Sequence, residues 1–387
     1  MDRPFDVAVI GAGLAGLATA SRLATAGLRT ALIDRKQDLT RGIHTTGIFV
    51  RKTLADFQFP PGSLGPPISQ VVLATIGGRE VLVASDKEEF RLGRMANLYG
   101  QLLADAEHRG VVWLPGTRLV ELACEPSGAR LNLVRQGRQL SLRARFVIGA
   151  DGARSTVAAY LGLDQNHHWI VGVEEVLGGV RYDGPPRFWC LLDPVIAPGY
   201  LGWVIHDGEE VHLGVGGYGH RFVPAECLEA LRHHAKRWLD LSAGRLIERR
   251  GGLIPVGGVL HRIGSTRGLL VGDAAGAPSP LTAGGLDPCL RLAALASHLT
   301  ARWLATNDPA ELARYDGSRF RARFVSRLLM RRGFNSLASR PLVSLAMRFL
   351  ATPPGTAFAR HVFFGRGSFP DVGVPLGQLA QRAQPSS

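Results

Sequence analysis

The feature that most constrains the fold is a glycine-rich segment, GAGLAG, at residues 11–16 of the 387-residue chain. It follows an apolar run at residues 5–10, which indicates a buried strand. It also opens a stretch with helical apolar spacing at residues 14–26. A strand, a tight turn and a helix in this order predict the first unit of a doubly wound α/β fold.

The glycines of this segment predict separate roles. Gly11 permits the turn, Gly13 lets the backbone approach a pyrophosphate at the positive helix end, and Gly16 lets the helix pack closely on the strand. Asp34 ends a second apolar stretch at residues 30–33, where its carboxylate can accept hydrogen bonds from ribose hydroxyls. Together they predict dinucleotide binding.

A second fingerprint, VGDAAG, lies at residues 271–276 behind a short apolar stretch at residues 268–271. Its small residues allow close backbone contact, and the carboxylate of Asp273 can accept hydrogen bonds from the hydroxyls of a ribityl chain. A long helix is expected to begin near Gly284 and Gly285. Backbone N–H groups at that start would stabilise negative charge on a reduced flavin, so the two fingerprints favour FAD over NAD.

A third segment, RARFVIGADGARSTVAAYLGL, lies between the two fingerprints. Residues 146–148 indicate a strand, Asp151 and Gly152 a turn, and Ser155 a helix cap. GxGxxG, a DG motif and a GD motif occur in this order in the FAD-dependent aromatic hydroxylases and their relatives. The chain resembles that superfamily over most of its length.

Within this superfamily the chain is most similar to the geranylgeranyl reductases, flavoproteins that saturate isolated double bonds of prenyl chains. PLTAGGL at residues 280–286 is similar to their PLTGEGI-like stretch, with departures at residues 283–284. Residues 197–219 resemble their PxxYxWxFP-like motif, which lines the substrate cavity. In this chain Tyr200 stands three residues before Trp203 rather than two, and Ile-His replaces Phe-Pro.

The resemblance and the fingerprints imply an FAD site. Arg94 begins a helix, where a guanidinium is poorly placed for the helix dipole, so a phosphate or flavin partner would explain it; the alternative is a solvated arginine. Thr46 could hydrogen-bond the flavin from a loop that often bears a cysteine in the family, and Leu119 would lie beside the adenine. No thiol chemistry is expected there. The implied FAD-binding residues are Gly11, Gly13, Ala15, Gly16, Asp34, Arg35, Thr46, Arg94, Leu119, Asp273, Gly284, Gly285 and Leu286.

Tyr200 and Trp203 are the predicted catalytic residues. Reduced FAD would deliver a hydride to one alkene carbon, and a proton must reach the other. Both aromatic rings would wall the cavity of an apolar, branched isoprenoid substrate, and Tyr200 would supply the proton. The alternative is that both rings only fill the core of a β-rich lobe.

Three other activities compete with a prenyl reductase. A monooxygenase would use the same flavin to hydroxylate a small apolar or aromatic metabolite. A halogenase is disfavoured because the WxWxIP motif of that family is absent. A non-catalytic protein would bind FAD or an isoprenoid without turnover. No further dinucleotide fingerprint marks an NAD(P)H site, so the sequence leaves three electron donors open: NAD(P)H, reduced ferredoxin and reduced flavin.

The net charge of +13 comes almost entirely from arginine. Arginines alternate with apolar residues at near-helical spacing over residues 314–332, which predicts a basic amphipathic helix that contacts a membrane surface. The alternative is a core-packing helix with a solvated basic face. Nucleic-acid binding is disfavoured, because stacking platforms and the motifs of such proteins are not recognisable.

Cysteine and histidine spacing predicts neither a disulfide framework nor a metal site. The first strand begins at once, without a signal-peptide pattern, so a cytoplasmic protein is expected, either free or peripheral at the membrane.

The predicted fold is α/β, with a Rossmann-like FAD-binding domain, an inserted mixed or antiparallel β-sheet substrate domain and a helical C-terminal region. From residue 353 the chain is expected to be loop-like, with a frayed end at residues 381–387. The predicted bounds are 1–60, 90–160 and 250–305 for the FAD domain, 61–89 and 161–249 for the substrate domain, and 306–387 for the C-terminal region.

Overall fold

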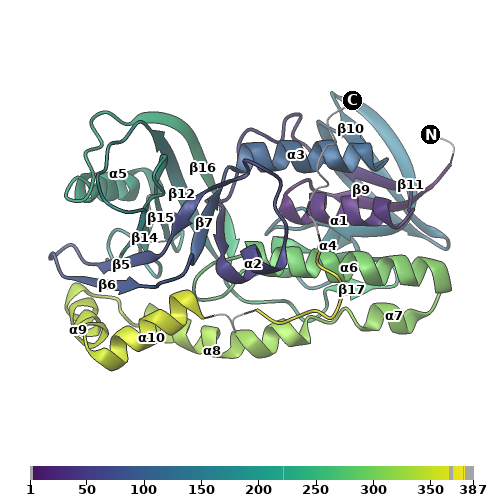
Figure 1. The fold of residues 1–387 in the computed structure, drawn as a ribbon. Coiled ribbons are helices and arrows are strands. Elements are labelled where there is room, and N and C mark those ends of the chain that lie inside the picture. The colour runs from purple at the N-terminus through teal and green to yellow at the C-terminus, as the bar shows by residue number, and fades with distance from the viewer. Residues whose placement is uncertain (1–2, 221, 366–368, 378, 380–387) are drawn as a thin grey trace.

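The computed structural model describes residues 3–220, 222–365, 369–377 and 379. Two lobes lie side by side, each built on a β-sheet, and helices from the C-terminal part of the chain run beneath both (Figure 1). This arrangement confirms the expected mixed α/β architecture with a helical C-terminal region. The helices are α1 (Leu14–Thr25), α2 (Arg51–Asp56), α3 (Met95–His108), α4 (Thr156–Tyr160), α5 (Pro224–Ala235), the 3₁₀ helix η1 (Gly272–Ala275), α6 (Leu286–Thr306), α7 (Pro309–Ala313), α8 (Ser318–Asn335), α9 (Arg340–Leu350) and α10 (Pro353–Phe364).

The lobe that contains the N-terminal strand has an eight-stranded sheet. Its parallel centre runs in the order β18, β11, β1, β2, β8, and β9 and β10 extend β11 as an antiparallel meander. The apolar run of β1 is almost wholly buried, as expected for a parallel strand with helices over its faces. The strands are β1 (Phe5–Ile10), β2 (Thr30–Ile33), β8 (Val112–Leu114), β9 (Thr117–Glu125), β10 (Gly128–Arg135), β11 (Arg138–Gly149), β17 (Gly264–Ser265) and β18 (Gly268–Leu270).

Two glycines of the first fingerprint are required by packing. Gly11 has φ +100°, and a Cβ there would lie 2.2 Å from the carbonyl oxygen of Ala150. A Cβ on Gly16 would lie 1.8 Å from the carbonyl oxygen of Gly11. The tight turn and the close approach of α1 to β1 therefore both depend on glycine, as predicted.

The second lobe has a seven-stranded sheet in the order β16, β12, β15, β14, β13, β5, β6. Neighbours are antiparallel except β13 and β5, which pair in parallel, so residues 70–84 do add strands to this sheet as expected. The boundary expected between residues 249 and 250 is wrong, because β16 continues in this sheet to Pro255. The strands are β5 (Gln70–Ala74), β6 (Glu80–Ala84), β12 (Trp169–Gly178), β13 (Arg187–Leu191), β14 (Gly202–His206), β15 (Glu210–Gly217) and β16 (Arg245–Pro255).

A small sheet connects the lobes. In it β7 pairs with both neighbours in antiparallel fashion, and α3 follows directly from its end. This sheet lies within the segment of the chain that crosses from one lobe to the other (Figure 1). Its strands are β3 (Ile48–Val50), β4 (Leu64–Ile68) and β7 (Phe90–Gly93).

The expectation of a loop-like region from residue 353 is wrong for residues 353–364, whereas the described residues 369–377 form neither helix nor strand, as expected. Residues 353–364 form α10, with Pro353 in the first turn, where a missing N–H costs nothing, and Thr352 as a cap whose hydroxyl accepts from the Gly355 N–H. Further on, the Leu379 N–H donates to the carbonyl of Gln58 in the N-terminal lobe. The expected frayed end at residues 381–387 lies outside the described residues.

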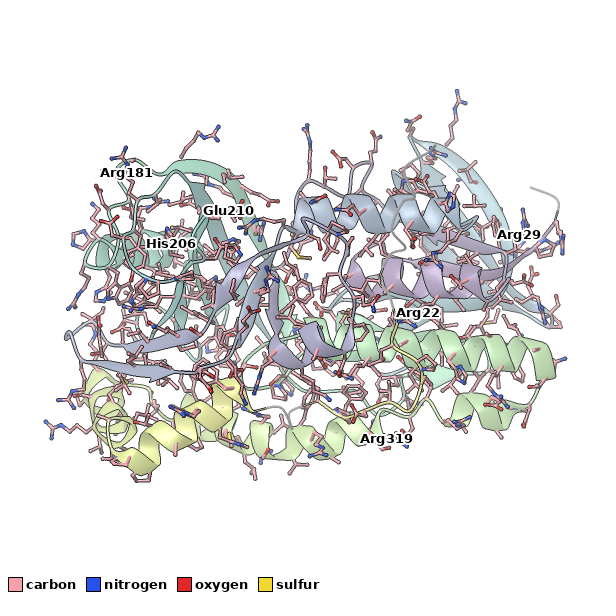
Figure 2. The ribbon with its side chains drawn as sticks, in the orientation of Figure 1. Arg22, Arg29, Arg181, His206, Glu210 and Arg319 are labelled. Atoms are coloured by element: carbon pink, nitrogen blue, oxygen red, sulfur yellow. The ribbon has the colours of Figure 1, made fainter. Side chains whose placement is uncertain are left out.

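The basic stretch at residues 314–332 forms most of α8, but much of it is core. Phe320 and Phe324 are buried, and so are two of its arginines, Arg327 and Arg331. By contrast, Arg319 of the same stretch lies on the outside of the molecule, as do Arg29 and Arg181 elsewhere in the chain (Figure 2). Among the described residues, no helix is long and apolar enough to cross a membrane.

Candidate active site

A cavity of about 1210 Å³ is lined by the glycine turn, both later motifs, the seven-stranded sheet and the C-terminal helices. Ligand pockets for small molecules are commonly about 300–1,000 Å³, so this cavity has room for more than one bound group. Most of the predicted FAD-binding residues converge on it. Those that line it are Gly11, Gly13, Ala15, Asp34, Arg35, Thr46, Leu119, Asp273, Gly284, Gly285 and Leu286.

The turn before α1 forms a cradle for a phosphate. Gly13 has an extended backbone, and a Cβ added there would meet no atom within 4 Å, because it would project into the cavity. Asp34 holds the turn: its carboxylate accepts from the Ala12 N–H at 2.7 Å and from the Lys36 N–H at 2.8 Å. The first N–H groups of a helix have no partner within the helix, so those at the start of α1 can bind an anion. These features fit the pyrophosphate of a dinucleotide.

Asp273, in η1, fits the second predicted contact. Its side chain lines the cavity, and none of the described residues donates a hydrogen bond to its carboxylate. Burial raises the pKa of Asp273 to about 6. Asp273 is only partly exposed, and a poorly hydrated carboxylate without a donor is costly; the hydroxyls of a ribityl chain would supply donors. Nearby, Gly284 and Gly285 bring the start of α6 to the same cavity, where its dipole favours negative charge.

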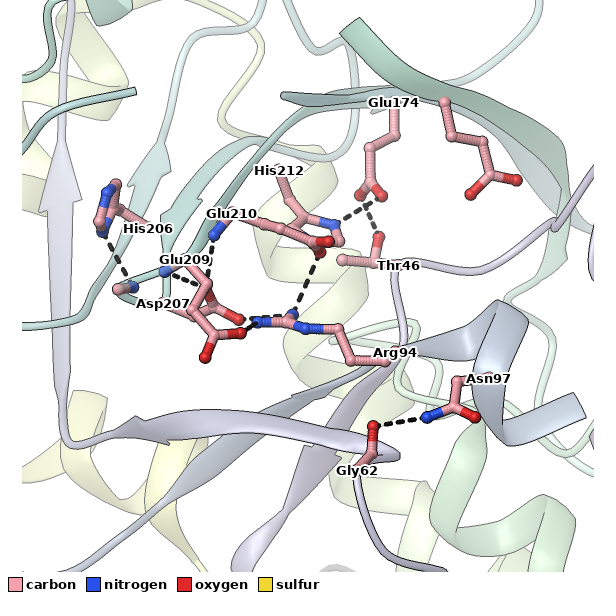
Figure 3. A network of polar contacts seen from close by, with 12 residues as sticks. Thr46, Gly62, Arg94, Asn97, Glu174, His206, Asp207, Glu209, Glu210 and His212 are labelled. Carbon is pink, nitrogen blue, oxygen red and sulfur yellow. Dashed lines mark hydrogen bonds and ion pairs between the residues drawn. The ribbon is translucent and has the colours of Figure 1, made fainter. Parts of the chain in front are cut away.

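Two members of the predicted FAD set do not line the cavity. Gly16 packs α1 on β1 instead. Arg94 is held by carboxylates of the second lobe: its guanidinium lies 2.7 Å from Asp207, 2.5 Å from Glu209 and 3.1 Å from Glu210 (Figure 3). Burial opposes its charge, but these carboxylates outweigh burial and raise the pKa of Arg94. The structure does not support the predicted contact of Arg94 with the flavin or a phosphate, because carboxylates already pair with its guanidinium.

Tyr200 and Trp203 both line the cavity, with their rings in an edge contact. The Tyr200 hydroxyl donates to the carbonyl of Thr282 at 2.7 Å, and burial raises the pKa of this phenol. Tyr200 is therefore poorly suited as the proton source predicted for it. The Trp203 indole N–H donates to Glu174 at 2.6 Å. The two rings act as cavity walls in fixed positions.

Sequence reasoning missed the polar group beneath that wall. Glu174, on β12, is buried and accepts from the Thr46 hydroxyl at 2.5 Å and from the His212 imidazole at 3.0 Å. Arg250, on β16, lies 3.4 Å from the same carboxylate and donates to the carbonyl of Thr45 at 3.1 Å. The available signal was a pair of charged residues, Glu174 and Glu175, inside the otherwise apolar stretch WIVGVEEVLG, since buried charges need partners.

The far end of the cavity is an apolar channel. Its walls come from the C-terminal helices rather than from the motifs that the sequence highlights. Aromatic and aliphatic side chains dominate there, so the channel is suited to a hydrocarbon chain. The channel residues are Met330, Phe334, Leu337, Ala346, Phe349, Leu350, Phe358, Val362 and Phe363.

Comparisons with known proteins agree on a flavoprotein. Residues 6–49 match the FAD dependent oxidoreductase family and residues 95–191 match the FAD binding domain family. The chain is 30% identical over 326 residues to a digeranylgeranylglycerophospholipid reductase of Methanopyrus kandleri, covering 79% of this chain and 82% of that protein. It is 24% identical to a reductase of the same name from Methanococcoides burtonii, covering 90% and 88% of the two chains.

A solved structure has a very similar fold. The geranylgeranyl bacteriochlorophyll reductase-like protein of Thermoplasma acidophilum superimposes with a TM-score of 0.81 at 19% identity, covering 94% of this chain and 98% of that one. The family matches and the cavity geometry agree that FAD is the cofactor and that the chain is an oxidoreductase.

Proposed function

Because the chain belongs to the FAD-dependent family of geranylgeranyl reductase-like oxidoreductases, we propose that it reduces carbon–carbon double bonds in a prenyl chain. The observation that carries this proposal is the continuity of the cavity. One end fits a dinucleotide, and the same cavity continues into an apolar channel between helices α8, α9 and α10. A prenyl chain in that channel would present its double bonds to the cofactor end.

When bound, FAD supplies the hydride chemistry, and the residues of the chain bind and orient the reactants. The glycine turn and Asp273 hold the cofactor. Tyr200 and Trp203 form a rigid wall beside the substrate, since each ring is fixed by a hydrogen bond. A prenyl chain bound in the apolar channel would displace water, and electrostatic interactions are stronger where water is absent.

The test is product mass under anaerobic conditions. Purified protein with FAD is incubated with dithionite and a panel of prenylated lipids, and then with NAD(P)H, reduced ferredoxin or reduced flavin as donor. Products should gain pairs of hydrogens, because hydride transfer needs no oxygen. A product that gains one oxygen atom, with turnover that stops when oxygen is removed, would reject the reductase and establish a monooxygenase.

We also propose that the enzyme reaches its substrate from a membrane surface. Phe349 and Phe358 line the channel and are also 52% and 43% exposed, so the channel opens beside them. We call the exposed residues of helices α8, α9 and α10 the α8–α10 surface. Its exposed apolar residues are Val325, Leu329, Leu342, Leu345, Phe349 and Phe358, and its exposed arginines are Arg323, Arg332, Arg348 and Arg360.

An apolar face with basic residues around it suits the interface of an anionic bilayer, where each arginine adds about 1 kcal/mol of attraction. The sequence predicted membrane contact through α8 alone. Because the inner face of α8 is buried in the core, we propose contact through α8, α9 and α10 together. A position on the cytoplasmic side of the membrane remains a prediction.

A further inference from the structure

A row of buried ionisable groups leads from the surface to the cavity. Glu210 and His212 stand two residues apart on β15, so both side chains lie on one face of the sheet. His212 Nε2 lies 3.4 Å from Glu210, and its Nδ1 lies 3.0 Å from Glu174. Glu174 in turn accepts from the Thr46 hydroxyl at 2.5 Å, and Thr46 lines the cavity (Figure 3).

The two ends of this row differ in exposure. The His212 side chain is fully buried and that of Glu174 is 3% exposed, whereas that of Glu210 is 23% exposed. The outer carboxylate also has a surface partner, because Arg94 binds both Glu210 and the largely exposed Glu209. The row therefore begins at the partly exposed Glu210 and ends at the wall of the cavity.

We propose that Glu210, His212 and Glu174 form a proton route from the surface to the hydroxyl of Thr46. This inference rests on the proposed function, since saturating a double bond consumes one proton for each hydride. Thr46 Oγ gives its proton to the substrate carbon. The Glu174 carboxylate, which is charged at rest, takes a proton from the His212 imidazolium and passes it to the Thr46 oxygen. Neutral His212 then regains a proton from solvent through Glu210. The net result is one solvent proton transferred to carbon.

The electrostatics suit a proton held at His212. Burial opposes its charge, but Glu174 and Glu210 outweigh burial and the repulsion from Arg250, so the pKa of His212 is raised above 6.5. Burial also opposes charge on Glu174, but His212, Arg250 and the Thr46 hydroxyl outweigh it and lower the pKa of that carboxyl. The resting proton therefore lies on His212, one hydrogen bond from Glu174.

Three variants test the route. His212→Gln keeps a polar group but cannot carry the proton, and Glu210→Gln breaks the entry step. Glu209→Gln is the matched control, because Glu209 binds the same arginine yet contacts neither His212 nor the cavity. Glu210 is partly exposed, so Glu210→Gln is expected to fold, and it is the decisive variant.

The first readout is independent of substrate. Imidazole NMR signals of the purified protein are followed against pH, with His212 assigned by its absence in His212→Gln. The pKa of His212 should lie above 6.5 in the wild type and in Glu209→Gln, and should fall in Glu210→Gln. A His212 pKa that Glu210→Gln does not move would overturn the route.

The second readout is the pH profile of kcat and its solvent deuterium isotope effect on a prenylated lipid. Wild-type kcat should fall as pH rises through the raised pKa of His212. His212→Gln should lower kcat by about 10²-fold or more and flatten the profile. Glu210→Gln should lower kcat about tenfold with a larger isotope effect and an unchanged KM, while Glu209→Gln should match the wild type.

The outcomes separate the two proposals. A wild type that saturates no prenylated lipid would reject the proposed function, and the NMR titration would then decide whether Glu210 controls protonation of His212. An active wild type with Glu210→Gln and Glu209→Gln alike in kcat and isotope effect would reject the route alone. Loss of stability without a change in pH profile would mean that these residues are only structural.

Discussion

The two ends of the cavity differ in whether backbone or side chains line them. At the cofactor end, the glycine turn and the start of α6 contribute backbone. The Asp273 side chain adds a carboxylate to which no described residue donates a hydrogen bond. The channel end consists of side chains from three helices near the end of the chain. Backbone cradles tolerate no added atoms, whereas a channel of side chains can change shape by substitution. We therefore expect cofactor binding to fail abruptly on mutation and substrate selection to change by degrees.

The largest effect is expected at Gly13. Gly13→Val should fold, because the backbone there is extended and an added Cβ meets no protein atom within 4 Å. It should lose FAD, because the side chain would occupy the pyrophosphate cradle. Absorbance of the purified protein and titration calorimetry measure this. Gly16→Ala is the contrast, since its Cβ would collide with the carbonyl of Gly11 and destabilise the fold itself. Normal FAD affinity in Gly13→Val would refute the cradle.

Asp273→Ala should weaken FAD binding by about 1.5–3 kcal/mol, the range for a hydrogen bond to a charged group. A pH effect on the apoprotein is a second signature. The folded-state pKa is raised from 3.8 to about 6, so wild-type stability should fall as pH rises from about 4 to 6. The full effect is about 3 kcal/mol, at about 1.4 kcal/mol for each tenfold change in proton affinity.

In the Asp273→Ala apoprotein this loss of stability should be absent. Urea unfolding at several pH values measures it, and calorimetry measures FAD affinity. If the variant binds FAD like the wild type, Asp273 is only a loop residue and the second fingerprint loses its meaning.

A change in the channel should leave the cofactor end intact. Ala346→Trp places a large ring among the channel residues, and we expect a loss of about 1–3 kcal/mol in kcat/KM for long prenyl chains, with less for short ones. FAD affinity should not change. Ala357→Trp, on the exposed side of α10 and away from the cavity, is the control. Equal losses for all chain lengths would mean that the channel does not hold the prenyl chain.

The smallest effect is expected on the outer surface. Leu345 is 63% exposed on α9, and Leu345→Asp should weaken binding to anionic phosphatidylglycerol vesicles by about 1–2 kcal/mol. Leu140→Asp is the control, because this exposed leucine lies on β11 in the other lobe. Wild-type binding should weaken with added salt. Vesicle binding that both variants reduce equally would contradict docking through the α8–α10 surface.

Prediction from sequence succeeded where an interaction is local. The helix cap at Ser155 is an example: its hydroxyl accepts from the Ala158 N–H, three residues away. The bounds predicted for β1 and β2 also agree with the structure, because a buried parallel strand is a continuous apolar run. Arg94 shows the opposite case. Its partners lie more than a hundred residues away, so no local pattern could reveal them.

By itself, the sequence determined the cofactor. The glycines, the two fingerprints and their order specify backbone geometry over short distances, and a dinucleotide is recognised mainly by backbone. Only the tertiary structure decided how the cavity continues, which arginines are core, and how Glu210, His212, Glu174 and Thr46 come into one row. Those contacts join β15, β12 and the loop before β3, and side chains that meet across such separations are positioned by packing rather than by their neighbours in the chain.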